Sequence, residues 1–103
     1  MNTVFVVKNC AYQFMVAPEE VKFDWVNKIL NTENMESFHL DKDLYVLNTT
    51  NKEQKFTYRI RFGENMKEIE GDFMLAKKEN NSFLPLSEQL EDFIIDNVEI
   101  TRI

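Results

Sequence analysis

The sequence is poor in the residues that build several common kinds of site. Its 103 residues include one cysteine, two glycines, two prolines and one histidine. The lone Cys10 cannot form an internal disulfide. This argues against a small secreted domain held together by disulfides and favours a protein of a reducing compartment. Gly63 and Gly71 are too few to build a phosphate-binding loop or a nucleophile elbow. These absences disfavour nucleotide-dependent and serine-hydrolase chemistry.

Long apolar runs are also missing. No stretch approaches the roughly 20 residues of a membrane-spanning helix. The first residues lack the basic region of a signal peptide, and Lys8 interrupts their apolar run. The sequence therefore predicts a cytoplasmic protein without membrane association.

A packed interior is nevertheless expected. The hydrophobic fraction is 44% and nine residues are Phe, which is enough for a modest core in one domain over residues 1–103. Proline- or glycine-rich linkers and internal repeats, which would mark a second domain, are absent from the sequence.

The net charge of −6 is concentrated at one end of the sequence. Residues 79–101 contain six acids and no Lys or Arg, whereas the rest of the chain has twelve acids and twelve bases. A negative electrostatic field concentrated at one end of the protein would attract partners with positive charge.

The first 34 residues predict a hairpin followed by a helix. Residues 3–8 and 11–16 are strand-like, and a two-residue turn between them places Phe5 opposite Phe14 and Val7 opposite Tyr12. Proline at position 18 is suited to a helix start. The apolar positions of this helix recur at helical spacing and comprise Val21, Trp25, Val26, Ile29 and Leu30, and the polar residues 31–34 end it.

Two further hairpins are expected in the middle of the chain. Residues 37–40 and 44–48 flank a turn at 41–43, and a polar turn follows at 49–53. Residues 54–62 alternate between apolar and basic or hydroxyl side chains, and we expect them to pair with a strand at 67–75 through a loop at 63–66. The predicted cross-strand pairs are Arg61–Glu68, Arg59–Glu70, Thr57–Asp72, Ile60–Ile69, Phe56–Phe73 and Tyr58–Gly71.

A second helix and a short strand complete the prediction. Residues 77–82 are expected to form a polar loop, and the helix begins at Pro85 or Ser87 and ends near Asn97. Val98 to Ile103 suggest a closing strand. The order β-β-α-β-β-β-β-α-β predicts an α+β fold, with an antiparallel meander of about six to seven strands and both helices on one face.

Candidate metal and nucleophile sites are weak. His39, Asp41 and Asp43 alternate along the chain and could hold a divalent cation, but Asp-Lys-Asp is also typical of a hairpin turn. Cys10 would need a base to act as a nucleophile, and His39 is the sole imidazole. We therefore predict no metal, no cofactor and no enzymatic activity, although a small carboxylate-based enzyme remains an alternative.

A nucleic-acid surface is a further hypothesis to weigh. Lys52, Lys55, Arg59 and Arg61 alternate with Phe56 and Tyr58. The predicted hairpin turns the aromatic rings into the core and pairs the arginines with acids, and the net charge of −6 opposes phosphate binding. Direct nucleic-acid binding is therefore not expected.

The strongest candidate site is the acidic second helix. Glu88, Asp92 and Asp96 recur every four residues and define what we call the acidic stripe. Glu91 lies beside it, and Glu99 follows the helix. A solvated polar face explains such residues equally well, but surface helices usually mix charges at this spacing.

The sequence thus predicts a small non-enzymatic domain that binds a basic macromolecular partner protein. Its most concrete form is an inhibitor that mimics nucleic acid, as an immunity protein or a phage-encoded antagonist of host defence would. The predicted partner-binding residues are Glu88, Glu91, Asp92, Asp96 and Glu99. An accessory subunit of a larger assembly, with self-association as one form of it, is the alternative.

Overall fold

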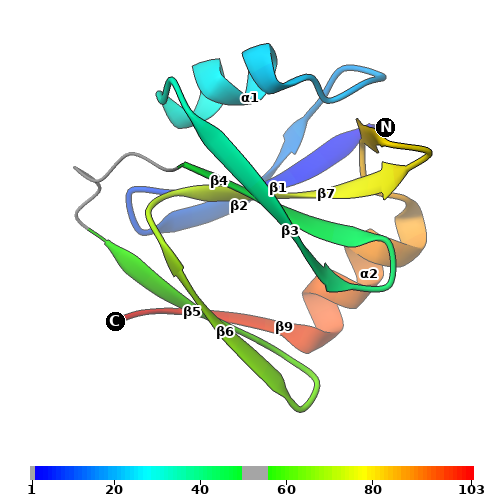
Figure 1. The fold of residues 1–103 in the computed structure, drawn as a ribbon. Coiled ribbons are helices and arrows are strands. Elements are labelled where there is room, and N and C mark those ends of the chain that lie inside the picture. The colour runs from blue at the N-terminus through cyan, green and yellow to red at the C-terminus, as the bar shows by residue number, and fades with distance from the viewer. Residues whose placement is uncertain (1, 50–55) are drawn as a thin grey trace.

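The computed structural model describes residues 2–49 and 56–103, which form two helices and nine strands (Figure 1). The elements, in chain order, are β1 (Thr3–Lys8), β2 (Ala11–Val16), α1 (Phe23–Leu30), β3 (Met35–Asp41), β4 (Leu44–Thr49), β5 (Thr57–Phe62), β6 (Asn65–Glu70), β7 (Phe73–Glu79), β8 (Ser82–Leu84), α2 (Glu88–Asn97) and β9 (Val98–Arg102). All paired strands are antiparallel. The predicted α+β class with antiparallel sheet is confirmed.

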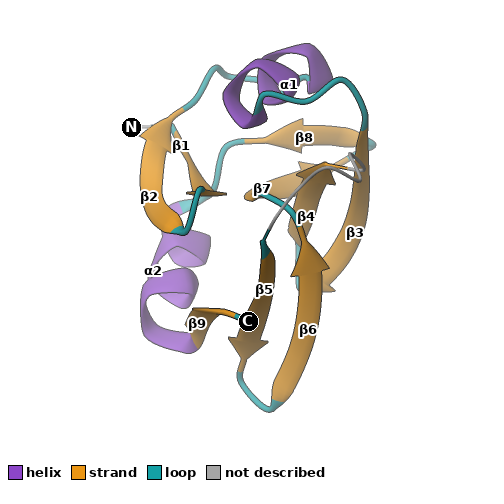
Figure 2. Ribbon diagram, turned by 90° about the vertical axis from the view of Figure 1, so that its left-hand side faces the viewer, coloured by secondary structure: helices purple, strands orange, loops and turns teal. Residues whose placement is uncertain are grey.

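The strands are divided between two sheets rather than gathered in one meander. The larger sheet has the order β2-β1-β7-β4-β3, with β8 paired to β7, and the smaller has the order β6-β5-β9. Figure 2 shows the smaller sheet lying beneath the larger one, with α2 beside it. Strands β1 and β7 are neighbours although they lie far apart in the sequence: Val7 pairs with Phe73, which is 66 positions later, and Phe5 pairs with Leu75.

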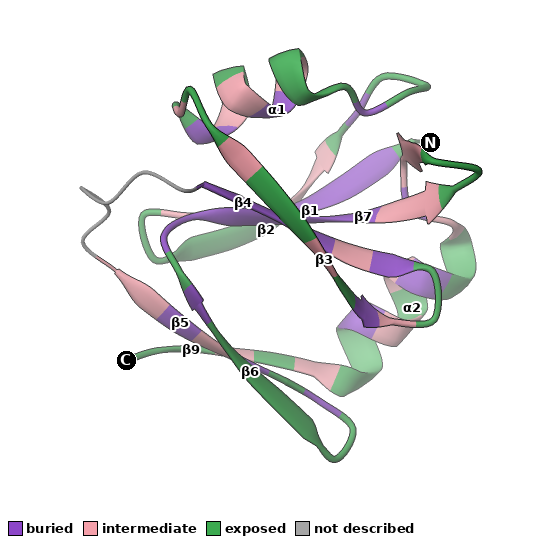
Figure 3. Ribbon diagram, in the orientation of Figure 1, coloured by how far each residue is buried: buried purple, intermediate pink, exposed green. Residues whose placement is uncertain are grey.

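The central strands of the larger sheet are buried on both faces (Figure 3). One face packs against α1 through Val26 and Leu30, and the other packs against α2 and the smaller sheet through Leu90 and Ile94. The helices therefore lie on opposite faces, and the expectation that both cover one face was wrong. The physical reason is that adjacent residues of β1, β4 and β7 are both apolar, so each face needs its own cover.

The N-terminal hairpin forms in the predicted register. Phe5 pairs with Phe14 and Val7 with Tyr12 across a turn at Asn9 and Cys10. Both turn residues have positive φ, 51° and 68°, which fits the right-handed twist of a two-residue hairpin. The hairpin at 35–49 was also predicted correctly, with its turn at residues 42 and 43.

The first helix begins later than predicted. It starts at Phe23 rather than at Pro18. The Ala17 amide donates to the Asn2 carbonyl at 2.8 Å, and the Val21 amide donates to the Phe83 carbonyl at 2.9 Å. These bonds hold residues 17–21 against neighbouring strands, so the chain cannot wind into a helix there. Asn31 ends the helix with φ of 53°, within the polar run expected to end it.

The hairpin of β5 and β6 is shifted by two residues from the predicted register. Its turn contains residues 63 and 64 alone, and the observed pairs are Thr57–Glu70, Tyr58–Ile69, Arg59–Glu68, Ile60–Lys67, Arg61–Met66 and Phe62–Asn65. Gly63 supplies the left-handed φ of 58° that the short turn needs. A shift of two keeps every side chain on its predicted face, so Arg59 still meets a glutamate. The polar turn expected at 49–53 and the strand start at 54–55 lie largely outside the described residues.

The segment 67–75 is not one strand, as predicted, but passes from one sheet to the other at Gly71 and Asp72. Strand β6 ends at Glu70 and β7 begins at Phe73. Gly71 has φ of 83°, which favours glycine because other side chains rarely adopt it. Its amide donates to the Phe56 carbonyl at 2.8 Å. The predicted pairs Thr57–Asp72, Tyr58–Gly71 and Phe56–Phe73 are therefore wrong.

The C-terminal elements agree with the prediction except for one strand. Residues 77–82 were expected to form a loop, but β7 runs to Glu79 and turns through residues 80 and 81 into β8. Ser87, which was one of the two predicted helix starts, caps α2. The helix ends at Asn97, directly before β9.

A buried polar cluster connects the two sheets beside this crossing. The Asp72 side chain is 4% exposed, and one of its oxygens accepts from the Asn9 amide and from the Tyr58 hydroxyl, both at 3.1 Å. The Tyr58 oxygen accepts in turn from the Cys10 amide at 2.9 Å. The turn between β1 and β2 is thereby attached to β5 and to the start of β7.

Replacing Tyr58 by Phe tests this cluster. The substitution removes one donor to the buried Asp72 carboxylate and the acceptor of the Cys10 amide, so we expect a loss of about 1–3 kcal/mol in the free energy of unfolding, measured by urea denaturation. Tyr45→Phe is the matched control, because no hydrogen bond to the Tyr45 hydroxyl is found among the described residues, and its expected effect is below about 0.5 kcal/mol. Equal effects of the two variants would contradict the proposed role of the cluster.

The same hydroxyl gives a pH dependence. Burial raises the pKa of Tyr58 to about 12, with Asp72 acting in the same direction and the Cys10 amide opposing. An unfolded tyrosine ionises near a pKa of about 10, so the stabilisation is complete below about pH 10 and is lost between about pH 10 and 12. We expect the stability difference between the wild type and Tyr58→Phe to shrink over that range. Denaturation curves at several pH values would measure it, and a constant difference would contradict it.

Candidate partner-binding surface

Helix α2 is fixed to the body of the protein by its apolar side and by its first turn. The Ser87 hydroxyl accepts from the Leu90 amide at 3.2 Å, which is the usual cap for a helix start. Leu86, Leu90 and Ile94 are buried in the core between the sheets, and Phe93 packs against it half-buried. The predicted apolar side is thus the side that packs, which leaves the acids outside.

The acidic stripe is exposed to solvent along its whole length. Glu88, Asp92 and Asp96 are all exposed. Within residues 2–49 and 56–103, the ion pairs are Arg59–Glu68 at 3.3 Å and Lys77–Glu79 at 3.0 Å, and neither involves the stripe. The helix also has no basic residue in its last turn. The stripe is therefore a row of carboxylates that no ion pair with a described residue neutralises.

Two of the five predicted partner-binding residues lie apart from the stripe. A carboxylate oxygen of Glu91 accepts a short hydrogen bond from the Thr3 hydroxyl, which turns this half-buried side chain toward β1. Glu99 is exposed on β9, where its register neighbour on β5 is Arg61. Glu91 thus serves to attach α2, and Glu99 lies near a cation, whereas the three stripe residues remain open.

Among the described residues, more bases contact aromatic rings than form ion pairs with acids. Lys67 lies over Phe38, Lys78 over Tyr45 and Phe83, and Arg102 over Phe56, at 4.7–5.4 Å from the ring centroids. Lys42 lies 4.9 Å from the centroid of Phe93, on α2 itself. One ammonium group therefore borders the acidic helix, a neighbour that the sequence did not reveal.

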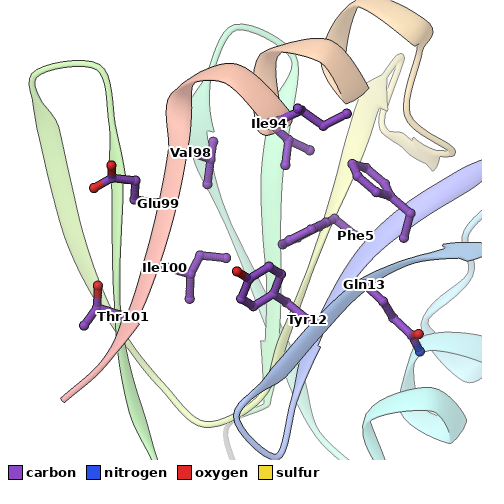
Figure 4. Close-up of a pocket in the computed structure, with 10 residues that line it drawn as sticks. Phe5, Tyr12, Gln13, Ile94, Val98, Glu99, Ile100 and Thr101 are labelled. Atoms are coloured by element: carbon purple, nitrogen blue, oxygen red, sulfur yellow. The ribbon is translucent and has the colours of Figure 1, made fainter.

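An apolar groove runs beside the acidic stripe, between β2 and the α2–β9 segment (Figure 4). Its volume is about 590 Å³, within the roughly 300–1,000 Å³ range of ligand sites. Its lining consists of Phe5, Tyr12, Gln13, Phe14, Ile94, Ile95, Val98, Glu99, Ile100 and Thr101. Tyr12 is 63% exposed and Ile95 67%, the latter on the solvent side of α2. Sequence reasoning missed this groove, although an isoleucine among acids was a visible signal.

The weaker candidate sites have structural explanations. The exposed His39 ring donates from Nε2 to the Lys42 carbonyl at 2.6 Å, across the turn that contains Asp43. In the described part of the chain, His39, Asp41 and Asp43 form no group of three that could hold a metal. Cys10 is exposed in the turn between β1 and β2, and its backbone amide donates a hydrogen bond to the Tyr58 hydroxyl oxygen.

The alternating strand presents its arginines as predicted. Tyr58 and Phe62 are buried, Arg61 is exposed, and Arg59 is paired with Glu68. The aromatic rings are thus turned into the core, where bases could not stack on them. Lys52 and Lys55, the other bases of the nucleic-acid hypothesis, lie outside the described residues. None of the described helices is long and apolar enough to cross a membrane.

Comparison with known protein families, curated proteins and solved structures gave no match to this chain.

The charges of the stripe predict a measurable effect on stability. Asp92 has like charges four residues away on both sides, Glu88 and Asp96, and like-charge pairs at this spacing cost about 0.2–0.5 kcal/mol each. We expect Asp92→Lys to increase the free energy of unfolding by about 0.5–1 kcal/mol at low salt, and Asp92→Asn to give about half of that gain. Urea denaturation measures both. A loss of stability with Asp92→Lys would show that the carboxylate has a favourable structural contact instead.

Proposed function

We propose that this protein binds a basic partner protein through the acidic stripe of α2, in the manner of a small inhibitor or antagonist. The observation that carries the proposal is that α2 combines three exposed carboxylates, which form no ion pair with a described residue, with Ile95, which is 67% exposed on the same helix. Carboxylates alone would only keep the surface hydrated. An exposed large apolar side chain among them is typical of a contact surface, where burial supplies free energy and charge supplies specificity.

The spacing of the stripe suggests what kind of partner fits. Four helical residues rise about 6 Å, so Glu88, Asp92 and Asp96 form a row of negative charges at about that interval. A row of this kind complements a groove lined by Lys and Arg, such as the one in which a nucleic-acid-binding protein holds phosphates. Binding there would block the partner's own ligand. The proposed role is therefore that of an antagonist acting on a basic, nucleic-acid-binding effector.

Affinity capture with paired variants tests the proposal. We expect the wild type to retain a basic protein from a host extract at about 0.05 M salt and to release it near 0.5 M, because salt screens the attraction between exposed charges. Asp92→Lys combined with Asp96→Lys should abolish the capture of that protein, identified by mass spectrometry.

Glu19→Lys combined with Glu20→Lys is the matched control. Both residues are exposed and lie outside α2, in the segment between β2 and α1. The control changes the net charge by the same amount, so retention of the partner by this variant would assign the effect to the stripe. Loss of the partner with both double variants would show that overall charge is responsible and would contradict a specific site.

A further inference from the structure

Strand β2 differs from the other strands at the ends of the two sheets. The end strands are β2 and β3 in the larger sheet and β6 and β9 in the smaller one; the three-residue β8, paired with β7, is a further edge, and its Phe83 carbonyl accepts from the Val21 amide. Strands β3, β6 and β9 each carry at least two charged residues, and the register of β3 also shifts near its turn. Strand β2, with the sequence AYQFMV, has no charge, proline or glycine and keeps a regular register over all six residues. Edge strands are usually protected by such features, because an unprotected edge pairs with other chains.

The backbone of β2 offers hydrogen-bonding groups at this edge. In a hairpin with a two-residue turn, the residues that flank the turn, Lys8 and Ala11, form a hydrogen-bonded pair. The bonds then alternate along the ladder, so Gln13 faces β1, whereas the amide and carbonyl groups of Tyr12 and Phe14 face outward. No backbone hydrogen bond to Tyr12 or Phe14 from another element is found in the described ranges.

The apolar groove lies along this same edge. Phe5 contacts both Tyr12 and Phe14, with ring centroids 5.8 and 5.1 Å apart. Ile95, on α2, is also one of the lining residues. Glu99 is the sole charged residue among the lining residues, none of which is Lys or Arg. The site therefore combines an open strand edge, apolar walls and negative charge.

We infer that this edge and groove bind an extended segment of the partner protein that carries apolar side chains and a Lys or Arg on the same face of its strand. The segment adds a strand to β2, and on the face that borders the groove it inserts its apolar side chains between Tyr12 and Ile95 and directs its base toward Glu99 and the acidic stripe. The inference rests on the proposed function, to which it adds the conformation and chemistry of the bound segment. A second copy of this chain fits less well, because each copy carries a net charge of −6.

Two synthetic peptides of about eight residues, the length of a typical strand, provide the probe. In one, Val and Thr alternate and a Lys takes the last position on the Val face, and the other has the same composition with Val and Thr in separate blocks. We expect the alternating peptide to bind at least tenfold more tightly by calorimetry, since only this sequence places all its apolar side chains on one face of a strand. Equal affinities would overturn the inference.

Hydrogen exchange locates the added strand. On binding of the alternating peptide, we expect the amides of Tyr12 and Phe14 to exchange at least tenfold more slowly, whereas the amide of Gln13, already in the ladder, should change little. Unchanged exchange at Tyr12 and Phe14 would overturn the inference. Protection of these amides without peptide, increasing with protein concentration, would also overturn it, because the edge would then pair with a second copy.

Variants separate the backbone contact from the side-chain contact. Tyr12→Pro and Tyr12→Ser both remove the ring, but only the proline removes the outward amide, so we expect it to bind roughly threefold to tenfold more weakly than the serine variant. Ile95→Ser should weaken binding similarly. Met66→Ser is its control, because Met66 is 51% exposed on β6 and does not line the groove. If the Tyr12 variants do not fold, the comparison of Ile95→Ser with Met66→Ser and the hydrogen-exchange measurement still test whether the segment binds in the groove.

The two proposals fail in different ways. If Asp92→Lys with Asp96→Lys abolishes partner capture while Ile95→Ser and Tyr12→Ser leave it intact, the acidic stripe binds the partner and the groove does not. If the double charge reversal has no effect on capture or on peptide affinity, the proposed function fails, and the groove inference fails with it.

Discussion

The arrangement of the two sheets depends on one buried carboxylate. Asp72 lies where the chain leaves the smaller sheet and enters the larger one, and its oxygen accepts bonds from the Asn9 amide and the Tyr58 hydroxyl. A carboxylate in the interior is costly unless such donors surround it. The requirement therefore fixes the first turn of the protein against β5, and the position of β2 follows from it. The turn held by this contact leads into β2, which forms one wall of the groove.

The same arrangement of sheets and helices determines which charged side chains face solvent and which contact other residues. The core between the sheets takes the apolar side of α2, so the acids of this helix can only face solvent. Elsewhere, aromatic rings at the rims of the sheets hold Lys42, Lys67, Lys78 and Arg102, which ties these bases to particular places on the surface. As a result, the acidic stripe is open to solvent, whereas these four bases are engaged by aromatic rings.

Local sequence signals were sufficient for most elements but not for their assembly. The first hairpin and α2 followed from alternation, turn preference and a serine cap, all of which act over a few residues. The register of β5 and β6 did not, because two registers both place Arg59 opposite a glutamate and both keep the apolar face inward. The strand at 67–75 was misjudged because alternation continues through Gly71, whereas the continuous apolar run at 73–76 indicated a separate, doubly buried strand. The acids of α2 were visible in the sequence, but the groove was not, since it joins residues near position 12 with residues near position 95.

The pairing of β9 with β5 has a consequence for how the chain acquires its structure during synthesis. Strands β5 and β6 alone form a two-stranded hairpin, which is marginally stable in water, and β9 supplies the third strand of their sheet. The sheet can become stable only after residues 98–102 have left the ribosome. Until then the apolar face of β5, with Tyr58, Ile60 and Phe62, remains uncovered on the nascent chain. The smaller sheet thus cannot finish folding before β9 has been synthesised, and its most vulnerable interval is the time in which that face awaits β9.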